Sequence, residues 1–190
     1  MNESTSSSAS SPTEEVACFA GGCFWCLQPV FDACEGVLAT RVGYIGGDSP
    51  NPSYREVCSG TTGHVEAIEI RFDPTQVDFR QLLDLYWRSI DPTDGDGQFA
   101  DRGSQYRPVI YYHDEDQRWM AHKSLGELAA SRRFTDPIRV SIEAAKPFYP
   151  AEDEHQAYYQ TCASHYQQYK EGSGRGPFLR RTWGDDLPPV

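Results

Sequence analysis

From Glu15 onward the chain alternates short apolar segments of strand character with amphipathic segments of helical period, and this alternation restricts the possible folds most. The segment His64–Phe72 alternates apolar and polar side chains before an Asp-Pro turn, as strands do. The apolar residues of Asp78–Ile90 recur at the spacing of one helical face, which predicts a helix there. Further strands are predicted at Val16–Ala20, Val37–Tyr44, Arg107–Tyr112 and Ile138–Ile142, and further helices at Cys23–Phe31, Asp114–Ser131 and Glu152–Ser164.

These elements favour an α+β fold, an α/β two-layer sandwich with a plait-like mixed sheet, flanking helices and a long C-terminal coil. A long parallel sheet is disfavoured because no clear helix separates the strands that begin at Val37 and His64. The coil is expected because the segment after Gly172 has no hydrophobic period. Residues 1–14 are mostly Ser, Thr and other polar residues, which predicts a disordered N-terminal tail before a single catalytic domain over residues 15–190.

Composition narrows the class of partner. The 28 acidic and 17 basic side chains give a net charge of −11, which disfavours nucleic acid and anionic membranes as partners. The sequence has no basic start followed by an apolar run and no apolar stretch long enough to span a membrane. We therefore expect a cytoplasmic protein, and because no heptad pattern is present we expect a monomer.

Cytoplasmic cysteines are usually free, metal-bound or catalytic, so the six cysteines are candidates for chemistry. The segment Gly21–Cys26 (GGCFWC) lies between a predicted strand and a predicted helix. Unpaired N–H groups and the helix dipole at such a position lower the pKa of a thiol, which favours Cys23 as a nucleophile. Phe24 and Trp25 supply an aromatic wall beside it. A buried cysteine that only packs well is the alternative.

Cys23 and Cys26 also form a C-x-x-C pair, which suits a disulfide or a metal site. No second pair of zinc ligands has suitable spacing, so neither a metal nor a cofactor is expected. The pair alone is compatible with a general dithiol oxidoreductase. A Cys/His hydrolase, with His64 or His155 as the base, is another possibility. A binding module without catalysis leaves the Cys23 thiol and its aromatic neighbours unexplained.

A series of motifs follows in order along the chain: Gly22–Trp25, Gly43–Gly47, Asn51–Gly60, Thr62–Ala67, Asp101–Arg107, Ala151–Asp153 and His155-Gln156. With matching spacing over about Val16–His165, they closely resemble the type A peptide methionine sulfoxide reductases. The resemblance implies the α/β plait of that family and thiol-dependent reduction of the S epimer of methionine sulfoxide, free or in proteins. No cofactor is implied.

The resemblance also implies roles for individual residues. Cys23 matches the nucleophile that attacks the sulfoxide sulfur, which releases methionine and leaves a sulfenic acid. Glu66 matches the acid that protonates the sulfoxide oxygen, a role that requires a raised pKa. The remaining matches are Tyr54 and Tyr106 as hydrogen-bond donors to that oxygen, Asp101 as a polar substrate contact, and Phe24 with Trp25 around the S-methyl group. His64 is expected to be structural.

Many relatives carry a recycling cysteine in the C-terminal segment, and this sequence has none there, so the thiol that resolves the sulfenic acid is one of three candidates. Cys26 is favoured because it lies one helical turn from Cys23. Cys162 is the runner-up, and direct reduction by an external thiol is the third possibility. Either disulfide suits thioredoxin as reductant. Gln28 stands where many relatives carry Glu, which leaves the tuning of the Cys23 pKa open. No chemistry is assigned to Cys18, Cys34 and Cys58.

Overall fold

The computed structural model describes residues 13–188 and contains a six-stranded mixed sheet with the strand order β7-β6-β1-β3-β2-β8. Only the pair β6-β7 is parallel, and the other pairs of this sheet are antiparallel. The strands are β1 (Glu15–Ala20), β2 (Val37–Ile45), β3 (Val65–Phe72), β6 (Val109–Tyr112), β7 (Ser141–Ala144) and β8 (Tyr149–Pro150). A separate ribbon pairs β4 (Gly97–Gln98) with β5 (Asp101–Arg102). The α+β class with a mixed sheet is therefore confirmed.

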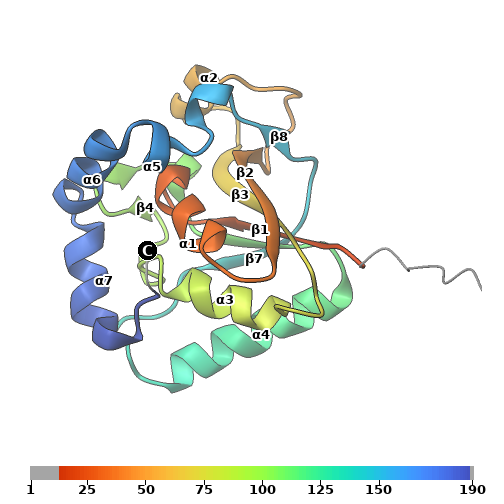
Figure 1. Ribbon diagram of the computed structural model, residues 1–190, viewed down its shortest axis with the longest axis vertical. Coiled ribbons are helices and arrows are strands. Elements are labelled where there is room, and N and C mark those ends of the chain that lie inside the picture. The colour runs from red at the N-terminus through yellow and green to blue at the C-terminus, as the bar shows by residue number, and fades with distance from the viewer. Residues whose placement is uncertain (1–12, 189–190) are drawn as a thin grey trace, which may run out of the picture.

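Helices flank this sheet (Figure 1). The α-helices are α1 (Gln28–Asp32), α2 (Tyr54–Cys58), α3 (Phe79–Trp87), α4 (Glu115–Ala130), α5 (Tyr158–Thr161), α6 (Ala163–Gly172) and α7 (Arg175–Trp183). Short 3-10 helices are η1 (Phe24–Cys26), η2 (Ser104–Tyr106), η3 (Asp153–His155) and η4 (Gly184–Asp186). In Figure 1, α3 and α4 run along one edge of the molecule, and α6 and α7 run along an adjoining edge.

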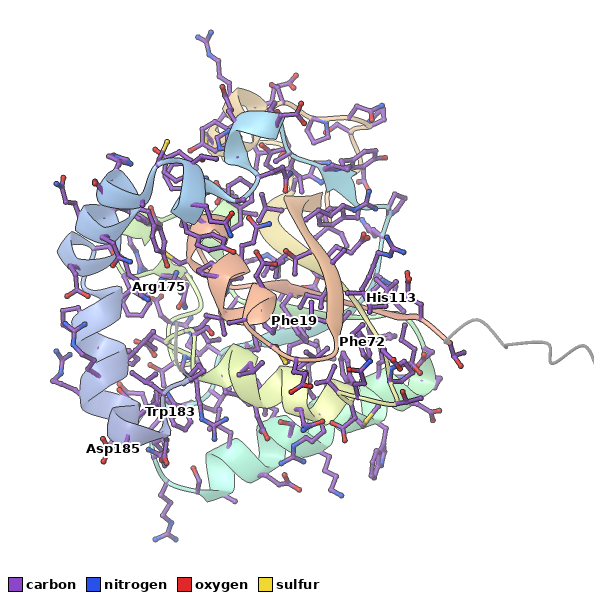
Figure 2. The ribbon with its side chains drawn as sticks, in the orientation of Figure 1. Phe19, Phe72, His113, Arg175, Trp183 and Asp185 are labelled. Carbon is purple, nitrogen blue, oxygen red and sulfur yellow. The ribbon has the colours of Figure 1, made fainter. Side chains whose placement is uncertain are left out.

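Phe19 lies at the centre of the larger hydrophobic core, between the sheet and the helices (Figure 2). Its ring centroid lies 5.0 Å from that of Tyr86 and 5.6 Å from that of Phe31. Because successive residues of a strand face opposite sides, the neighbouring Cys18 packs into a second, smaller core on the other face. The central strand β1 is thus buried on both faces, and it carries the chain directly into the segment that contains Cys23.

The predicted helix Cys23–Phe31 is interrupted in the structure. A 3-10 helix over Phe24–Cys26 ends at Leu27, and α1 begins at Gln28 with Pro29 in its first turn. Proline is tolerated there because the first helical N–H groups need no partner within the helix. The helix predicted at Asp78–Ile90 is confirmed as α3, where Asp78 and Gln81 form a capping box.

The expected C-terminal coil is wrong between Arg175 and Trp183, which form α7. Gly174, with a φ of 91°, separates this helix from α6. Leu179 and Trp183 are buried against the larger core. They are four residues apart, so they lie on the same face of the helix. Tertiary burial of this face explains why the segment is helical although it contains glycine and proline.

Two further boundaries differ from the sequence prediction. The expected helix Glu152–Ser164 is divided into η3 and α5, and α6 then continues to Gly172. Ala157 has a φ of 49°, which no α-helix accepts in its interior. The last predicted strand starts later, at Ser141, because only Ser141–Ala144 pair with β6.

The structure also contains α2, which lies within a segment predicted to have no clear helix. The signal was present in the sequence as the capping box of Ser53 and Glu56. Most of the expected N-terminal tail, residues 1–12, lies outside the described residues, while Glu14 is described and pairs with Arg71. Among residues 13–188, no helix is both long and apolar enough to cross a membrane.

Candidate active site

Cys23 follows the central strand β1 through a tight turn at Gly22, which has a φ of 79°. Such a φ strains any residue with a Cβ. A Cβ on Gly22 would also lie 2.7 Å from the guanidinium of Arg175, which comes from α7. The glycine therefore allows the Cys23 segment to approach both the β4 ribbon and the C-terminal helix closely. The Cys23 side chain is nearly buried, with 6% of its surface exposed.

Glu66 is a buried carboxylic acid next to this turn. It lies on β3, is 2% exposed, and accepts a hydrogen bond of 3.1 Å at Oε2 from the backbone N–H of Phe24. Burial raises the pKa of Glu66 to about 8, although the Phe24 hydrogen bond acts in the opposite direction. The nearby Asp101 carboxylate also raises it. A carboxyl with this pKa is mostly protonated at neutral pH and can donate a proton.

The Cys23 and Cys26 thiols lie close enough for each to shift the pKa of the other. Burial raises the pKa of Cys23, and the neighbouring Cys26 thiol and the Glu66 carboxyl raise it further. The sequence-based expectation of a lowered pKa at Cys23 is therefore wrong. The helix that follows Cys23 is a 3-10 helix of only three residues, so its dipole is small. This small dipole does not offset the cost of burying the Cys23 thiolate.

Tyr54 and Tyr106 come from two different elements and lie near enough to Glu66 for its charge to act on both phenols. Tyr54 is the first residue of α2 and Tyr106 is the last residue of η2. Burial raises the pKa of both phenols, and the charge of Glu66 is the next cause. Both hydroxyls therefore remain protonated and can donate hydrogen bonds at neutral pH.

Asp101 is held at the same site by the β4-β5 ribbon. The hydroxyl of Tyr169, from α6, donates a hydrogen bond to the Asp101 carboxylate. Asp101 is close enough to raise the pKa of Cys23 and of Glu66. Tyr169 could not be identified from the sequence, because nothing in the spacing of α6 shows which tyrosine faces β5.

Phe24 and Trp25 differ in exposure. The Phe24 ring is fully buried, with its centroid 5.5 Å from that of His155. Trp25 is partly exposed, stacks on Tyr158 at 3.9 Å, and donates from Nε1 to Nδ1 of His155 at 3.3 Å. Of the two rings expected around the S-methyl group, only Trp25 therefore has an exposed surface in this structure.

Glu152 is a second residue that the sequence analysis did not single out as functional. Its carboxylate accepts a 3.0 Å hydrogen bond from the backbone N–H of Tyr54 and a 3.1 Å hydrogen bond from the hydroxyl of Tyr44. It therefore positions the first turn of α2, from which the Tyr54 side chain extends. The only signal was its place in the motif Ala151–Asp153.

Within residues 13–188, neither His64 nor His155 is hydrogen-bonded to Cys23. The N–H of Gly47 donates to Nδ1 of His64, and Nε2 of His64 lies 2.8 Å from the carbonyl oxygen of Ser49. His64 thus orders the loop after β2, as a structural residue would. His155 accepts the indole N–H of Trp25, and burial lowers its pKa. This arrangement argues against a hydrolase that uses either histidine as a base for Cys23.

Of the remaining cysteines, Cys162 and Cys58 lie beside tyrosines of this site, and Cys18 and Cys34 pack in the two hydrophobic cores. Cys162 is exposed, and its thiol lies near enough to Tyr158, the residue that stacks on Trp25, to raise the pKa of that phenol. Cys58 lies beside the Tyr54 hydroxyl, a contact that the sequence did not suggest. Cys18 is fully buried in the smaller core, and Cys34 packs at the edge of the larger one.

Gln28 is buried and joins three elements. Its amide N–H donates to Thr40 at 3.1 Å, and its oxygen accepts the N–H of Ala157 at 2.8 Å. Ala157 is the residue with positive φ that precedes α5. Gln28 thus holds the start of α5, whose Tyr158 covers Trp25.

Comparison with known proteins gives a consistent set of similarities. The family model described as "Peptide methionine sulfoxide reductase" matches residues 15–187. The chain is 51% identical to the peptide methionine sulfoxide reductase MsrA of Listeria innocua over 169 residues, which cover 89% of this chain and 96% of the relative. It is also similar to Mxr1 from Saccharomyces cerevisiae in reduced form, with a TM-score of 0.72, 31% identity, and coverage of 78% of this chain and 85% of that chain. The Mxr1 structure in complex with Trx2 has a TM-score of 0.53, 22% identity, and coverage of 76% and 84%, and supports the fold alone.

Proposed function

Because the chain belongs to the peptide methionine sulfoxide reductase family, we propose that it reduces the S epimer of methionine sulfoxide through Cys23. The observation that carries this assignment is the pairing of the Cys23 turn with a buried acid. Glu66, with a pKa of about 8, is tied to that turn through the Phe24 N–H. A nucleophile beside a protonated acid matches a reaction in which sulfur is attacked while oxygen takes up a proton. Both free and protein-bound methionine sulfoxide fit this chemistry.

In the first step the Cys23 thiolate attacks the sulfoxide sulfur and Glu66 gives a proton to the sulfoxide oxygen. The phenols of Tyr54 and Tyr106 donate hydrogen bonds to the same oxygen, and Asp101 supplies a further polar contact. Methionine leaves, and the oxygen stays on Cys23 as a sulfenic acid. The proton that Cys23 releases on ionisation balances the one that Glu66 provides. Trp25 faces the S-methyl group, and the Phe24 ring stacks on that of Tyr54, with 6.5 Å between the ring centroids.

In the second step the Cys26 thiolate attacks the Cys23 sulfur, and the oxygen leaves as water after taking up one proton. Cys26 is favoured over Cys162 because the Cys26 thiol lies close enough to Cys23 for the two thiols to shift each other's pKa. Cys162 remains the runner-up, since its neighbour Tyr158 lies near enough for the charge of Cys23 to affect its pKa.

We propose thioredoxin as the reductant of this disulfide, for which the yeast protein offers a parallel through its complex with Trx2. Thioredoxin supplies two electrons and two protons, so that each cycle consumes one dithiol and yields one water. A reducing compartment suits an enzyme whose six cysteines are free in the structure, so we assign it to the cytoplasm. The further proposals are a monomer and a single catalytic domain over residues 15–190.

Mass spectrometry of the protein incubated with methionine sulfoxide and no reductant tests this function. We expect one equivalent of methionine and the loss of one pair of hydrogen atoms from the protein. Peptide mapping is expected to locate the disulfide between Cys23 and Cys26. A protein that stays fully reduced and releases no methionine contradicts the activity, and a Cys23–Cys162 disulfide contradicts only the choice of Cys26.

A further inference from the structure

Cys26 lines a small cavity on the side of η1 that faces α6 and α7. Its volume of about 70 Å³ is enough for a few water molecules, since a cavity of roughly 10–15 Å³ already holds one. Four basic side chains line this cavity together with Cys26: Arg88, Lys170, Arg175 and Arg180. Glu66, Tyr54, Tyr106 and Asp101 do not line it. The cavity is therefore distinct from the cluster around the substrate sulfur.

Arg175 contributes a buried positive charge beside this cavity (Figure 2). Its side chain is 2% exposed and donates hydrogen bonds to the carbonyl oxygens of Ser89 at 2.5 Å and Gly21 at 2.9 Å. Within residues 13–188 it forms no ion pair with a carboxylate, although a buried guanidinium without an anion is costly. Its location therefore favours a group nearby that becomes negative.

Lys170 contributes a second positive charge that lacks a carboxylate. It is half-buried and lines the cavity, and its ammonium forms no ion pair in the described part of the chain. The other two cations are already engaged, since Arg180 pairs with Glu171 at 2.7 Å and Arg88 donates to the carbonyl oxygen of Asp84. Among the residues that line the cavity, Cys26 alone has a side chain that can become an anion.

We propose that Lys170 and Arg175 act as positioning residues that stabilise Cys26 as the thiolate, both when it attacks the Cys23 sulfenic acid and when it leaves the Cys23–Cys26 disulfide. This inference rests on the proposed role of Cys26 as the resolving thiol. On resolution the Cys26 sulfur forms a bond to the Cys23 sulfur, and the hydroxyl leaves that sulfur as water. On recycling a thioredoxin thiolate attacks the Cys23 sulfur, and the bonding pair returns to Cys26 beside the two cations. The mixed disulfide then joins thioredoxin to Cys23.

The pKa of Cys26 supports a role for Lys170 and Arg175 in stabilising its thiolate. The neighbouring Cys23 thiol lowers the pKa of Cys26, and the charges of Arg175 and Lys170 lower it further, while burial and Asp101 act in the opposite direction. The titratable and charged groups that face Cys26 from the surrounding elements are Cys23, Glu66, Arg88, Asp101, Tyr166, Tyr169, Lys170, Arg175 and Arg180. Lys170 and Arg175 are the cations among them whose charges act on Cys26.

The test measures disulfide formation after rapid mixing of the reduced protein with methionine sulfoxide, as a function of pH, in the wild type and in Lys170→Met. The rate of disulfide formation is expected to rise with pH, and removing the ammonium is expected to move this rise to higher pH. At neutral pH disulfide formation is expected to slow about tenfold, since a change of one unit in the pKa of Cys26 changes its thiolate fraction tenfold. The burst of methionine, which reports the Cys23 step, is expected to be unchanged. Lys170→Arg is expected to restore the wild-type profile, and Lys123→Met, the same change on the exposed face of α4, is expected to have no effect.

A second readout separates the charge effect from turnover. In the Cys23→Ser protein, the rate at which iodoacetamide alkylates the Cys26 peptide is measured across pH, with and without Lys170→Met. We expect the alkylation midpoint to move to higher pH in the double variant. Identical midpoints and identical disulfide-formation profiles would overturn the proposal. If the wild-type disulfide excludes Cys26, the resolving role itself has failed and this inference fails with it, and peptide mapping distinguishes that result from a failure of the two cations alone.

Discussion

The backbone N–H of Phe24 donates a 3.1 Å hydrogen bond to the buried carboxyl of Glu66. This bond links the residue directly after Cys23 to a side chain of the central sheet, 42 positions later in the chain. A single backbone group thus fixes the nucleophile relative to the acid. The relationship also separates two roles of Glu66, since an amide in its place can keep the hydrogen bond but cannot supply a proton.

Replacing Glu66 with Gln is expected to lower kcat by about 10²–10⁴-fold, the usual contribution of a general acid. In the wild type the activity is expected to fall as pH rises through about 8, where Glu66 loses its proton. The variant is expected to lack this decline. The measurement is single-turnover methionine release across pH. An unchanged alkaline limb in Glu66→Gln would show that another group causes it.

Glu66 is also expected to make the fold less stable at alkaline pH. Its pKa in the folded protein, about 8, is raised above the ordinary 4.5, so its stabilising contribution is fully present below pH 4.5 and is lost as pH rises through 8. The total loss is on the order of a few kcal/mol. Urea denaturation at several pH values is expected to show a smaller decline for Glu66→Gln than for the wild type. Equal declines in the two proteins contradict the burial-raised pKa.

Replacing each cysteine of the C-x-x-C pair with serine is expected to block the catalytic cycle at a different step. Cys23→Ser removes the nucleophile, so neither a single turnover nor steady-state turnover remains. Cys26→Ser is expected to release one equivalent of methionine and then stop cycling with thioredoxin. The matched control is Cys162→Ser, which is expected to cycle normally because Cys26, and not Cys162, is the thiol that acts directly on Cys23. Normal cycling in Cys26→Ser with loss in Cys162→Ser reverses the assignment.

Tyr169→Phe removes the hydroxyl that hydrogen-bonds Asp101. A hydrogen bond to a charged group contributes about 1.5–3 kcal/mol, so we expect kcat/KM to fall about tenfold or more as Asp101 loses its orientation. Tyr166→Phe on the same helix is a suitable control, because the buried Tyr166 hydroxyl has no hydrogen-bond partner in the described residues. That variant is expected to keep its activity. Similar losses in both variants would indicate a general disturbance of α6.

Leu179→Ala tests whether α7 contributes to the core. Leu179 is 7% exposed, and truncating a buried leucine costs about 2–5 kcal/mol. The exposed Arg181 lies two residues away, and Arg181→Ala is expected to change stability by about 0.5 kcal/mol or less. Thermal denaturation of both variants checks the prediction. If the segment behaves as a coil in solution, both substitutions will have small effects.

The alternating pattern of His64–Phe72 and the amphipathic period of Asp78–Ile90 allowed β3 and α3 to be predicted from the sequence. Both patterns are local, and their periods follow from the geometry of a strand and a helix. The helix α7 was missed because its interior has weak local propensity and is stabilised by burial against residues distant in sequence. Contacts with other elements also decide where η1 ends and α1 begins, and they decide the positive φ of Ala157. Neither feature could therefore be predicted from the local sequence.

The sequence alone determined which residue types stand in the Gly21–Cys26 segment and in the motif around Glu66, and hence the family resemblance. Only the tertiary structure decided their ionisation, because the free energy of a buried charge depends on the groups that the fold places around it. Burial raises the pKa of Cys23, where the sequence predicted a lowered value, and it raises the pKa of Glu66 to about 8. The approach of Lys170 and Arg175 to Cys26 was likewise decided by the packing of α6 and α7, since these residues lie more than a hundred positions from Cys26 in the chain.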